Sequence, residues 1–240
     1  NNARINWDQL AESSQLHVRY LDNVVTWNED LNALEKQRLA AKETRRLGLG
    51  VMGIADMLNQ LGVAYDSEQG TMMIEKVMEY ITNASYQASS FIAKEKGASP
   101  IFDEKAYMEC PFVKEALSEQ THSMIRKHGL RNIAIMSIAP TGSISNIVLG
   151  YKSEEKNYIG VSGGVEPIFS TFYTRRSESF GNKMFKVFHS TIQAYIDKMD
   201  IQDDVDKADD VDEDLPEFLT RTAHKIDSLK RVGVQGVIQR

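Results

Sequence analysis

The feature that most constrains the fold is an apolar, isoleucine-rich stretch at residues 132–139 (NIAIMSIA), which runs directly into the sequence PTGSIS at 140–145. A short apolar run rich in Ile is typical of a buried strand. Pro140 cannot donate a hydrogen bond to a sheet, so it ends the predicted strand. Gly142 permits a tight turn, and a short helix is predicted over 144–149. The pattern therefore predicts a strand, a turn and a helix in immediate succession.

A strand, a turn and a helix start in this order can form an anion-binding site. Backbone N–H groups at the start of a helix have no partner within the helix, and the helix dipole adds about half a positive charge there. Thr141, Ser143 and Ser145 would add hydroxyl donors. Ser143 or Ser145 would equally serve as the cap of an ordinary turn. These residues alone leave both interpretations open, a phosphate cradle and a plain capped turn.

Composition excludes several classes of protein. Hydrophobic residues make up 42% of the 240 residues, as in a globular protein with a real core. The net charge of −6 argues against a nucleic-acid binder. No apolar run approaches 18 residues, so no membrane span is predicted. Cys110 is the single cysteine, which excludes an internal disulfide framework, and we expect it to be a small buried or half-buried residue. A cytoplasmic location is the default expectation.

Helical periodicity dominates the rest of the chain. Ser67 is suited to cap the longest predicted helix, and Gly97 to end it. A strand is predicted over 168–174 and a polar loop over 151–158. The predicted helices cover residues 7–27, 30–44, 51–61, 67–96, 112–128, 182–199, 216–224 and 226–240.

A glycine pattern offers an alternative function. Gly48, Gly50 and Gly53 match G-x-G-x-x-G, the fingerprint of dinucleotide binding. That site needs a buried strand before its first glycine, whereas the lead-in here is KETRR at 42–46. Close backbone packing is the preferred interpretation of the glycines. An NAD-binding oxidoreductase stays an alternative, as does a non-catalytic helical interaction module.

Neither the histidines nor the acidic residues predict a metal site. His122 and His128 are six residues apart and do not share a helical face. Residues 200–214 hold nine acidic residues but depart from the EF-hand pattern, with Ala208 and Asp209 at positions where the calcium loop needs other residues. We expect this segment to be a mobile, solvated insert.

Several ordered motifs resemble one family. They are Arg131-Asn132, the sequence SIAPTGSIS at 137–145, the sequence GGVEPIF at 163–169, and RRLGLGVMGIADM at 45–57. Together they resemble the large, catalytic subunit of ribonucleotide reductases, and they are most similar to the adenosylcobalamin-dependent group. The resemblance extends over roughly residues 6–240.

The resemblance implies a fold and a reaction. The fold would be α/β and helix-rich, the C-terminal half of the ten-stranded barrel of these reductases, with residues 1–240 forming a partial catalytic domain truncated at both ends. The reaction would replace the ribose 2′-hydroxyl by hydrogen through a protein radical, which supplies deoxyribonucleotides for DNA replication. The resemblance assigns the substrate's phosphates to Pro140, Thr141, Gly142, Ser143, Ile144 and Ser145.

The resemblance also implies a cofactor and partners. They are adenosylcobalamin, a ribonucleotide substrate, the N-terminal part of the reductase, a thioredoxin-like reductant and a second copy in a homodimer. The class that uses a separate iron-containing radical subunit stays open.

The radical chemistry itself is not expected within this chain. The family's radical cysteine lies in an Asn-x-Cys-x-Glu loop, and Cys110 lies instead in YMECPF at 107–112. No catalytic residue is therefore predicted here, and we expect the chain to be inactive alone. Glu166 is not predicted to be catalytic, and Arg175 and Arg176 are expected to be solvated.

Overall fold

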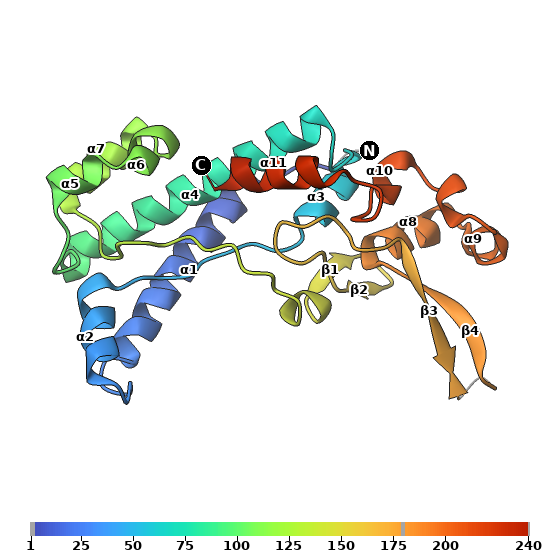
Figure 1. The fold of residues 1–240 in the computed structure, drawn as a ribbon, viewed down its shortest axis with the longest axis horizontal. Helices are drawn as coiled ribbons and strands as arrows, with labels where there is room; N and C mark the ends of the chain where they lie inside the picture. The colour runs from blue at the N-terminus through green and yellow to red at the C-terminus, as the bar shows by residue number, and fades with distance from the viewer. Residues whose placement is uncertain (1–2, 179–180, 240) are drawn as a thin grey trace. The chain divides into compact units, whose positions relative to one another are not determined.

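The computed structural model describes residues 3–178 and 181–239 (Figure 1). The chain divides into two compact units. The helical unit comprises residues 5–50, 75–138 and 238–240, and the site unit comprises residues 1–4, 51–74 and 139–237. Among the described residues, no helix combines the length and the apolar character that crossing a membrane requires.

Helices account for most of the regular structure, and the predicted helix-rich α/β composition is confirmed. The longer helices are α1 (Trp7–Trp27), α2 (Glu35–Thr44), α3 (Ile54–Leu61), α4 (Glu68–Lys96), α7 (Glu119–His128), α8 (Ser190–Met199) and α11 (Ser228–Ile238). The short ones are α5 (Glu104–Met108), α6 (Pro111–Ala116), α9 (Gln202–Lys207), α10 (Glu217–Thr220) and the 3₁₀ turns η1 (Ile144–Asn146) and η3 (Val211–Glu213). The strands are β1 (Leu149–Lys152), β2 (Asn157–Ile159), β3 (Phe172–Ser177) and β4 (Lys183–Phe188).

The two longest helices confirm their predictions. Helix α1 starts after Asn6, whose side chain accepts a hydrogen bond from the Gln9 N–H at 3.2 Å. The Ser67 hydroxyl accepts a hydrogen bond from the Gly70 N–H at 3.0 Å in the first turn of α4. Gly97 follows α4 with a φ of 87°, a left-handed conformation that glycine adopts without strain.

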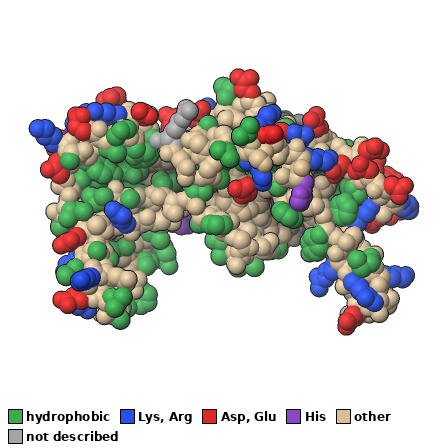
Figure 2. Space-filling view, in the orientation of Figure 1, with side chains coloured by type: hydrophobic (Ala, Val, Ile, Leu, Met, Phe, Trp, Pro, Cys, Tyr) green, Lys and Arg blue, Asp and Glu red, His purple; other side chains and the backbone are tan. Residues whose placement is uncertain are grey.

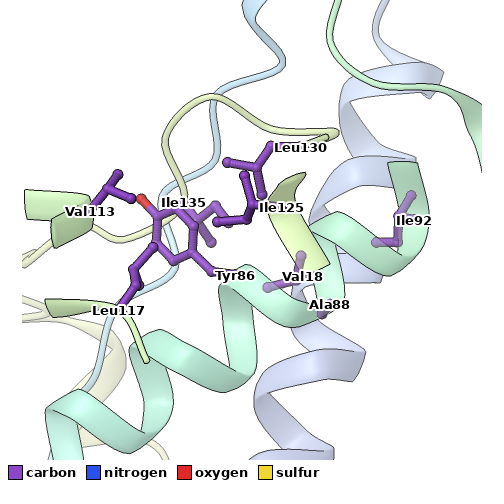
Figure 3. Close-up of a cluster of buried hydrophobic side chains, with 9 residues drawn as sticks. All are labelled: Val18, Tyr86, Ala88, Ile92, Val113, Leu117, Ile125, Leu130 and Ile135. Atoms are coloured by element: carbon purple, nitrogen blue, oxygen red, sulfur yellow. The ribbon is translucent and has the colours of Figure 1, made fainter. Parts of the chain in front are cut away.

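The core of the helical unit is a cluster of side chains from α1, α4, α6, α7 and the segments that follow them (Figure 3). Helix α4 contributes three of its members, and between Ile81 and Ala93 this helix is buried around most of its circumference. The buried members are Val18, Tyr86, Ala88, Ile92, Val113, Leu117, Ile125, Leu130 and Ile135.

Two predictions in this unit are wrong. The predicted helix 112–128 is broken at Leu117, whose backbone is extended, and Ser118 then caps α7 through the Thr121 N–H. Cys110 is exposed rather than buried, because it occupies the N-cap position just before Pro111 at the start of α6.

The predicted strand over 132–139 is also wrong in its details. In the described part of the chain this segment forms one parallel bridge, between Leu49 and Met136. The Leu49 N–H donates to Ile135 O, and the Ser137 N–H donates to Leu49 O, each at 2.8 Å. A ladder needs several successive pairs, and residues 47–49 supply too short a partner. The segment is therefore extended and partly buried without being a full strand.

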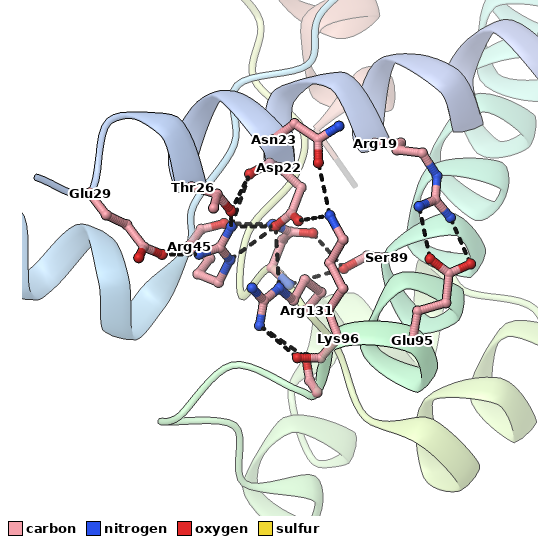
Figure 4. Close-up of polar contacts among 12 residues, drawn as sticks. Arg19, Asp22, Asn23, Thr26, Glu29, Arg45, Ser89, Glu95, Lys96 and Arg131 are labelled. Carbon is pink, nitrogen blue, oxygen red and sulfur yellow. Dashed lines mark hydrogen bonds and ion pairs between the residues drawn. The ribbon is translucent and has the colours of Figure 1, made fainter.

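A buried polar network joins α1 to the two segments that form this bridge (Figure 4). The Asp22 carboxylate, 0% exposed, accepts hydrogen bonds from Arg45 Nε at 3.0 Å and from Asn132 Nδ2 at 3.1 Å. The Ser89 hydroxyl on α4 donates to Asn132 Oδ1 at 2.9 Å. Two of the family-like motifs, at Arg45 and at Arg131-Asn132, thus contribute to one structural network.

The site unit holds two antiparallel hairpins, β1–β2 and β3–β4. The predicted loop 151–158 is wrong, since it contains the second half of β1 and the first two residues of β2. The predicted helix 182–199 starts only at Ser190, because residues 183–188 form β4 and pair with β3 from Phe172–Phe188 to Ser177–Lys183. The sequence KMFKVF at 183–188 is too short for the spacing of its apolar residues to distinguish a strand from a helix.

The β3–β4 hairpin presents cations to solvent, and Figure 2 shows Lys and Arg side chains gathered on it. Arg175, Arg176 and Lys183 are exposed, which agrees with the expectation that the two arginines are solvated. The acidic segment 200–214 is partly ordered by α9 and η3, with Val205 and Val211 buried. Its mobility stays a prediction.

Candidate phosphate-binding loop

Residues 140–147, here called the phosphate loop, form a turn followed by the single 3₁₀ turn η1. The Ser145 N–H donates to Thr141 O at 3.0 Å, and the Asn146 N–H donates to Ser143 O at 3.3 Å. The Asn146 side-chain amide donates to Gly142 O at 2.6 Å. The predicted helix over 144–149 is shorter than expected because β1 begins at Leu149.

The front of the loop offers backbone donors. Within the described residues, the N–H groups of Gly142, Ser143 and Ile144 donate no hydrogen bond, and all three residues are exposed. A Cβ atom placed on Gly142 would meet no atom within 4 Å. Three successive open N–H groups favour an anionic ligand, because the oxygens of a phosphate accept several hydrogen bonds at once.

The back of the loop is held by Thr141. Its φ of 53° is unusual for a β-branched residue. This conformation accompanies a hydrogen bond in which the Gly164 N–H donates to the Thr141 hydroxyl oxygen at 2.8 Å. The hydroxyl proton of Thr141 stays available for a second acceptor.

A glycine-rich turn, residues 162–165, packs against the same loop. A Cβ atom on Gly163 would lie 2.7 Å from Pro140 O, and one on Gly164 would lie 2.6 Å from Ala139 O. Side chains at either position would push the backbones apart. The family-like motifs at 137–145 and 163–169 therefore meet in one place.

The six predicted phosphate-binding residues differ in accessibility. Pro140, Gly142, Ser143 and Ile144 are exposed, and Thr141 is half-buried. Ser145 is 3% exposed, and its carbonyl accepts a hydrogen bond from the Val161 N–H at 2.8 Å. Ser145 therefore anchors the loop, while the other residues form its accessible face.

The glycine fingerprint is used for packing within the protein. Gly53 has a φ of 78°, its N–H donates to Ser162 O at 2.9 Å, and a Cβ atom there would lie 3.3 Å from the Val161 Cβ atom. Helix α2 ends at Thr44, so no buried strand leads into Gly48. The dinucleotide-binding alternative is therefore not supported.

Sequence reasoning missed a buried carboxylate beside the glycine-rich turn. Asp56 is 2% exposed and accepts hydrogen bonds from the Ser162 N–H at 2.6 Å and from the Thr191 hydroxyl at 2.5 Å. His189 Nδ1 lies 3.5 Å from Asp56 Oδ1, and burial lowers the pKa of His189 although Asp56 opposes that shift. The available signal was an aspartate among apolar residues in the motif at 45–57. No group of three metal-ligating side chains occurs among residues 3–178 and 181–239.

Comparison with known proteins gives one consistent result. The family model "Ribonucleotide reductase, barrel domain" matches residues 1–240. The vitamin B12-dependent ribonucleoside-diphosphate reductase of Mycobacterium tuberculosis (strain CDC 1551 / Oshkosh) is 34% identical over 174 residues, which cover 72% of this chain and 20% of that protein. The enzyme of the same name from Thermoplasma acidophilum is 33% identical over 172 residues, 72% of this chain and 19% of that protein.

A relative with a different name has a lower sequence identity to this chain. The ribonucleoside-diphosphate reductase subunit alpha of Chlamydia pneumoniae is 29% identical over 199 residues, which cover 74% of this chain and 18% of that subunit. The chain thus spans about a fifth of the length of the curated relatives that it matches.

Proposed function

Because this chain belongs to the ribonucleotide reductase barrel-domain family and its α/β fold is part of that barrel, we propose that its phosphate loop holds the phosphates of a ribonucleotide during reduction to a 2′-deoxyribonucleotide. The observation that carries this proposal is the run of open N–H groups at Gly142, Ser143 and Ile144. The names of the relatives point to a ribonucleoside diphosphate as the substrate.

The loop contributes position and charge stabilisation. Its backbone donors and the hydroxyls of Thr141 and Ser143 bind phosphate oxygens, which fixes the attached ribose in one place. Holding a reactant in a productive pose contributes up to about 7–11 kcal/mol when alignment is ideal. No side chain of the loop has to exchange a proton for this role.

We propose adenosylcobalamin for the complete enzyme, since two relatives are named vitamin B12-dependent. Its site is not identified among the described residues, where two grooves of about 530 and 540 Å³ suit a drug-sized ligand. We therefore assign no step of the cofactor to residues of this chain.

The remaining partners are proposals of the same kind. The radical cysteine comes from a segment with the Asn-x-Cys-x-Glu loop, a thioredoxin-like protein supplies electrons, and the complete enzyme is a cytoplasmic homodimer. We expect the purified chain alone to reduce no ribonucleotide, and turnover to appear only together with a segment that carries that loop.

Calorimetric titration of the purified chain with ADP tests the phosphate loop. Ser143→Asp places a negative charge beside the open N–H groups, so we expect at least about a tenfold loss of affinity. Ser143→Ala removes one hydroxyl and leaves the N–H group, so its effect should be smaller. Ser13→Asp, at an exposed position of α1, is the matched control and should bind like the wild type. The proposal is wrong if the wild-type chain does not bind ADP or if Ser143→Asp binds it equally well.

A further inference from the structure

Among the residues that the structure describes, no lysine or arginine forms an ion pair with a buried carboxylate in α3. Asp56 lies in the first turn of α3 and is 2% exposed. Within the described residues, its ion-pair contact is limited to His189, at 3.5 Å. A carboxylate is costly to bury, so its hydrogen bonds to Ser162 and Thr191 must stabilise it.

The start of α3 holds the backbone of Ser162 through both of its polar groups, which belong to two successive peptide groups. Its N–H donates to Asp56 Oδ2 at 2.6 Å, and its carbonyl accepts from the Gly53 N–H at 2.9 Å. Both contacts join residues more than a hundred positions apart in the sequence. The orientation of the peptide groups on either side of Ser162 is therefore set by α3 and not by the turn alone.

The residues on either side of Ser162 are hydrogen-bonded to the phosphate loop. Gly164, two residues after Ser162, donates its N–H to Thr141 Oγ1 at 2.8 Å. Val161, one residue before Ser162, donates its N–H to Ser145 O at 2.8 Å. The backbones are packed too closely at Gly163 and Gly164 for the turn to shift without moving the loop.

We infer that Asp56 is a positioning residue: through the backbone of Ser162 and the Gly164–Thr141 hydrogen bond it sets the conformation in which the phosphate loop presents its N–H groups. The consequence for ligand binding rests on the proposed function, whereas the coupling between Asp56 and the loop does not. Among the described residues, Asp56 forms no hydrogen bond or ion pair with the phosphate loop itself.

Amide hydrogen exchange measured by NMR tests the coupling without a ligand. Asp56→Ala removes both acceptor oxygens, so we expect exchange at Ser162, Gly164 and Ser145 to accelerate by at least about tenfold, as for the loss of a charge-assisted hydrogen bond. Asp56→Asn retains an acceptor for the Ser162 N–H and should restore most of the protection. Asp197→Ala, a matched change in α8 at a carboxylate that binds Lys156 and Tyr158, should leave Ser145 unaffected.

A double variant separates the proposed path from general destabilisation. Thr141→Val keeps the shape of the side chain but removes the acceptor for Gly164. In that background, Asp56→Ala should accelerate Ser162 as before but accelerate Ser145 several-fold less. Equal acceleration of Ser145 in both backgrounds, or none in either, would overturn the inference. If Asp56→Ala does not fold, Thr191→Val is the alternative variant, because it removes one hydrogen-bond donor to Asp56. It should accelerate exchange at the same amides by a smaller factor. Unchanged exchange at Ser145 in that variant would overturn the inference.

Titration with ADP distinguishes this inference from the proposed function. If the wild-type chain does not bind ADP, the proposed function fails, and exchange still decides the coupling. If the wild type binds ADP, we expect at least about tenfold weaker binding by Asp56→Ala and unchanged binding by Asp197→Ala. Equal binding by Asp56→Ala and the wild type would overturn the positioning role.

Discussion

Replacing Asp22 by Asn removes the charge at the centre of the buried network in the helical unit. Asp22 is 0% exposed and Arg45 is 2% exposed, and Asp22 Oδ1 accepts from Arg45 Nε at 3.0 Å and from Nη2 at 2.9 Å. Breaking a buried ion pair by removing one partner costs about 3–5 kcal/mol, because the other charge is left uncompensated. Glu29, which is 2.7 Å from Arg45 Nη1, retains part of the compensation. We therefore expect a loss near the lower end, about 3 kcal/mol.

Urea unfolding followed by circular dichroism at pH 7 measures this loss. Glu95→Gln is the matched control, since Arg19 and Glu95 form a similar pair with both side chains 38% exposed. Exposed ion pairs contribute little to stability, so that change should hardly move the midpoint. A shift for Asp22→Asn no larger than that of Glu95→Gln would refute the reasoning. The double change Asp22→Leu with Arg45→Met should recover part of the stability, because it removes both fully buried charges, while Arg131, 3.5 Å from Asp22, loses its ion-pair partner.

The loss of stability caused by Asp22→Asn should depend on pH. Burial alone would raise the pKa of Asp22, but hydrogen bonding and attraction from Arg45, with help from Asn132 and Arg131, outweigh it and lower the pKa. A carboxylate with a lowered folded pKa stabilises the protein fully above its unfolded value, about 3.9, and loses that contribution as the pH falls through the folded value. The difference in stability between wild type and Asp22→Asn should therefore shrink below about pH 4.

Three further predictions concern the packing and titration of single residues. Gly164→Ala places a Cβ atom 2.6 Å from Ala139 O at a φ of 48°, so it should weaken ADP binding in calorimetry, whereas Gly142→Ala, which meets open space, should fold normally. The pKa of His189 is lowered chiefly by burial, so stability should fall as the pH drops below the unfolded value of about 6.5, and His189→Gln should flatten that part of the urea-midpoint profile. Ile125→Ala, at a position that is 0% exposed, should cost about 2–5 kcal/mol in urea unfolding; a cost below 1 kcal/mol would contradict the proposed core.

Local signals in the sequence predicted the long helices well. The bounds of α1 and α4 follow from apolar periodicity and from the residues that cap them. The strand β4 was predicted as helix because a six-residue apolar pattern fits both periods, and its pairing with β3 lies outside any local window. The apolar run 132–139 signals burial, but strand formation also needs a partner of sufficient length.

The candidate site could likewise be predicted from the sequence only in part. The phosphate loop and its glycine-rich neighbour could be found from motifs, because glycines and hydroxyl residues at fixed spacing carry the signal. The motif at 45–57 signals the burial of Asp56 but not its role, since that role depends on Ser162, a residue 106 positions further along the chain. A single aspartate in an amphipathic helix gives no local sign of such a partner.

The division of the chain into discontinuous units has a consequence for synthesis on the ribosome. Nearly all of the helical unit, including its core from Val18 to Ile135, has been translated by residue 138, whereas the site unit needs the chain up to residue 237. Since domains fold as units during synthesis, residues 51–74 emerge early and wait for their partners. Ile54, Leu58 and Tyr65, all buried in the finished protein, belong to the site unit, so their burial is complete only after the rest of that unit has been synthesised.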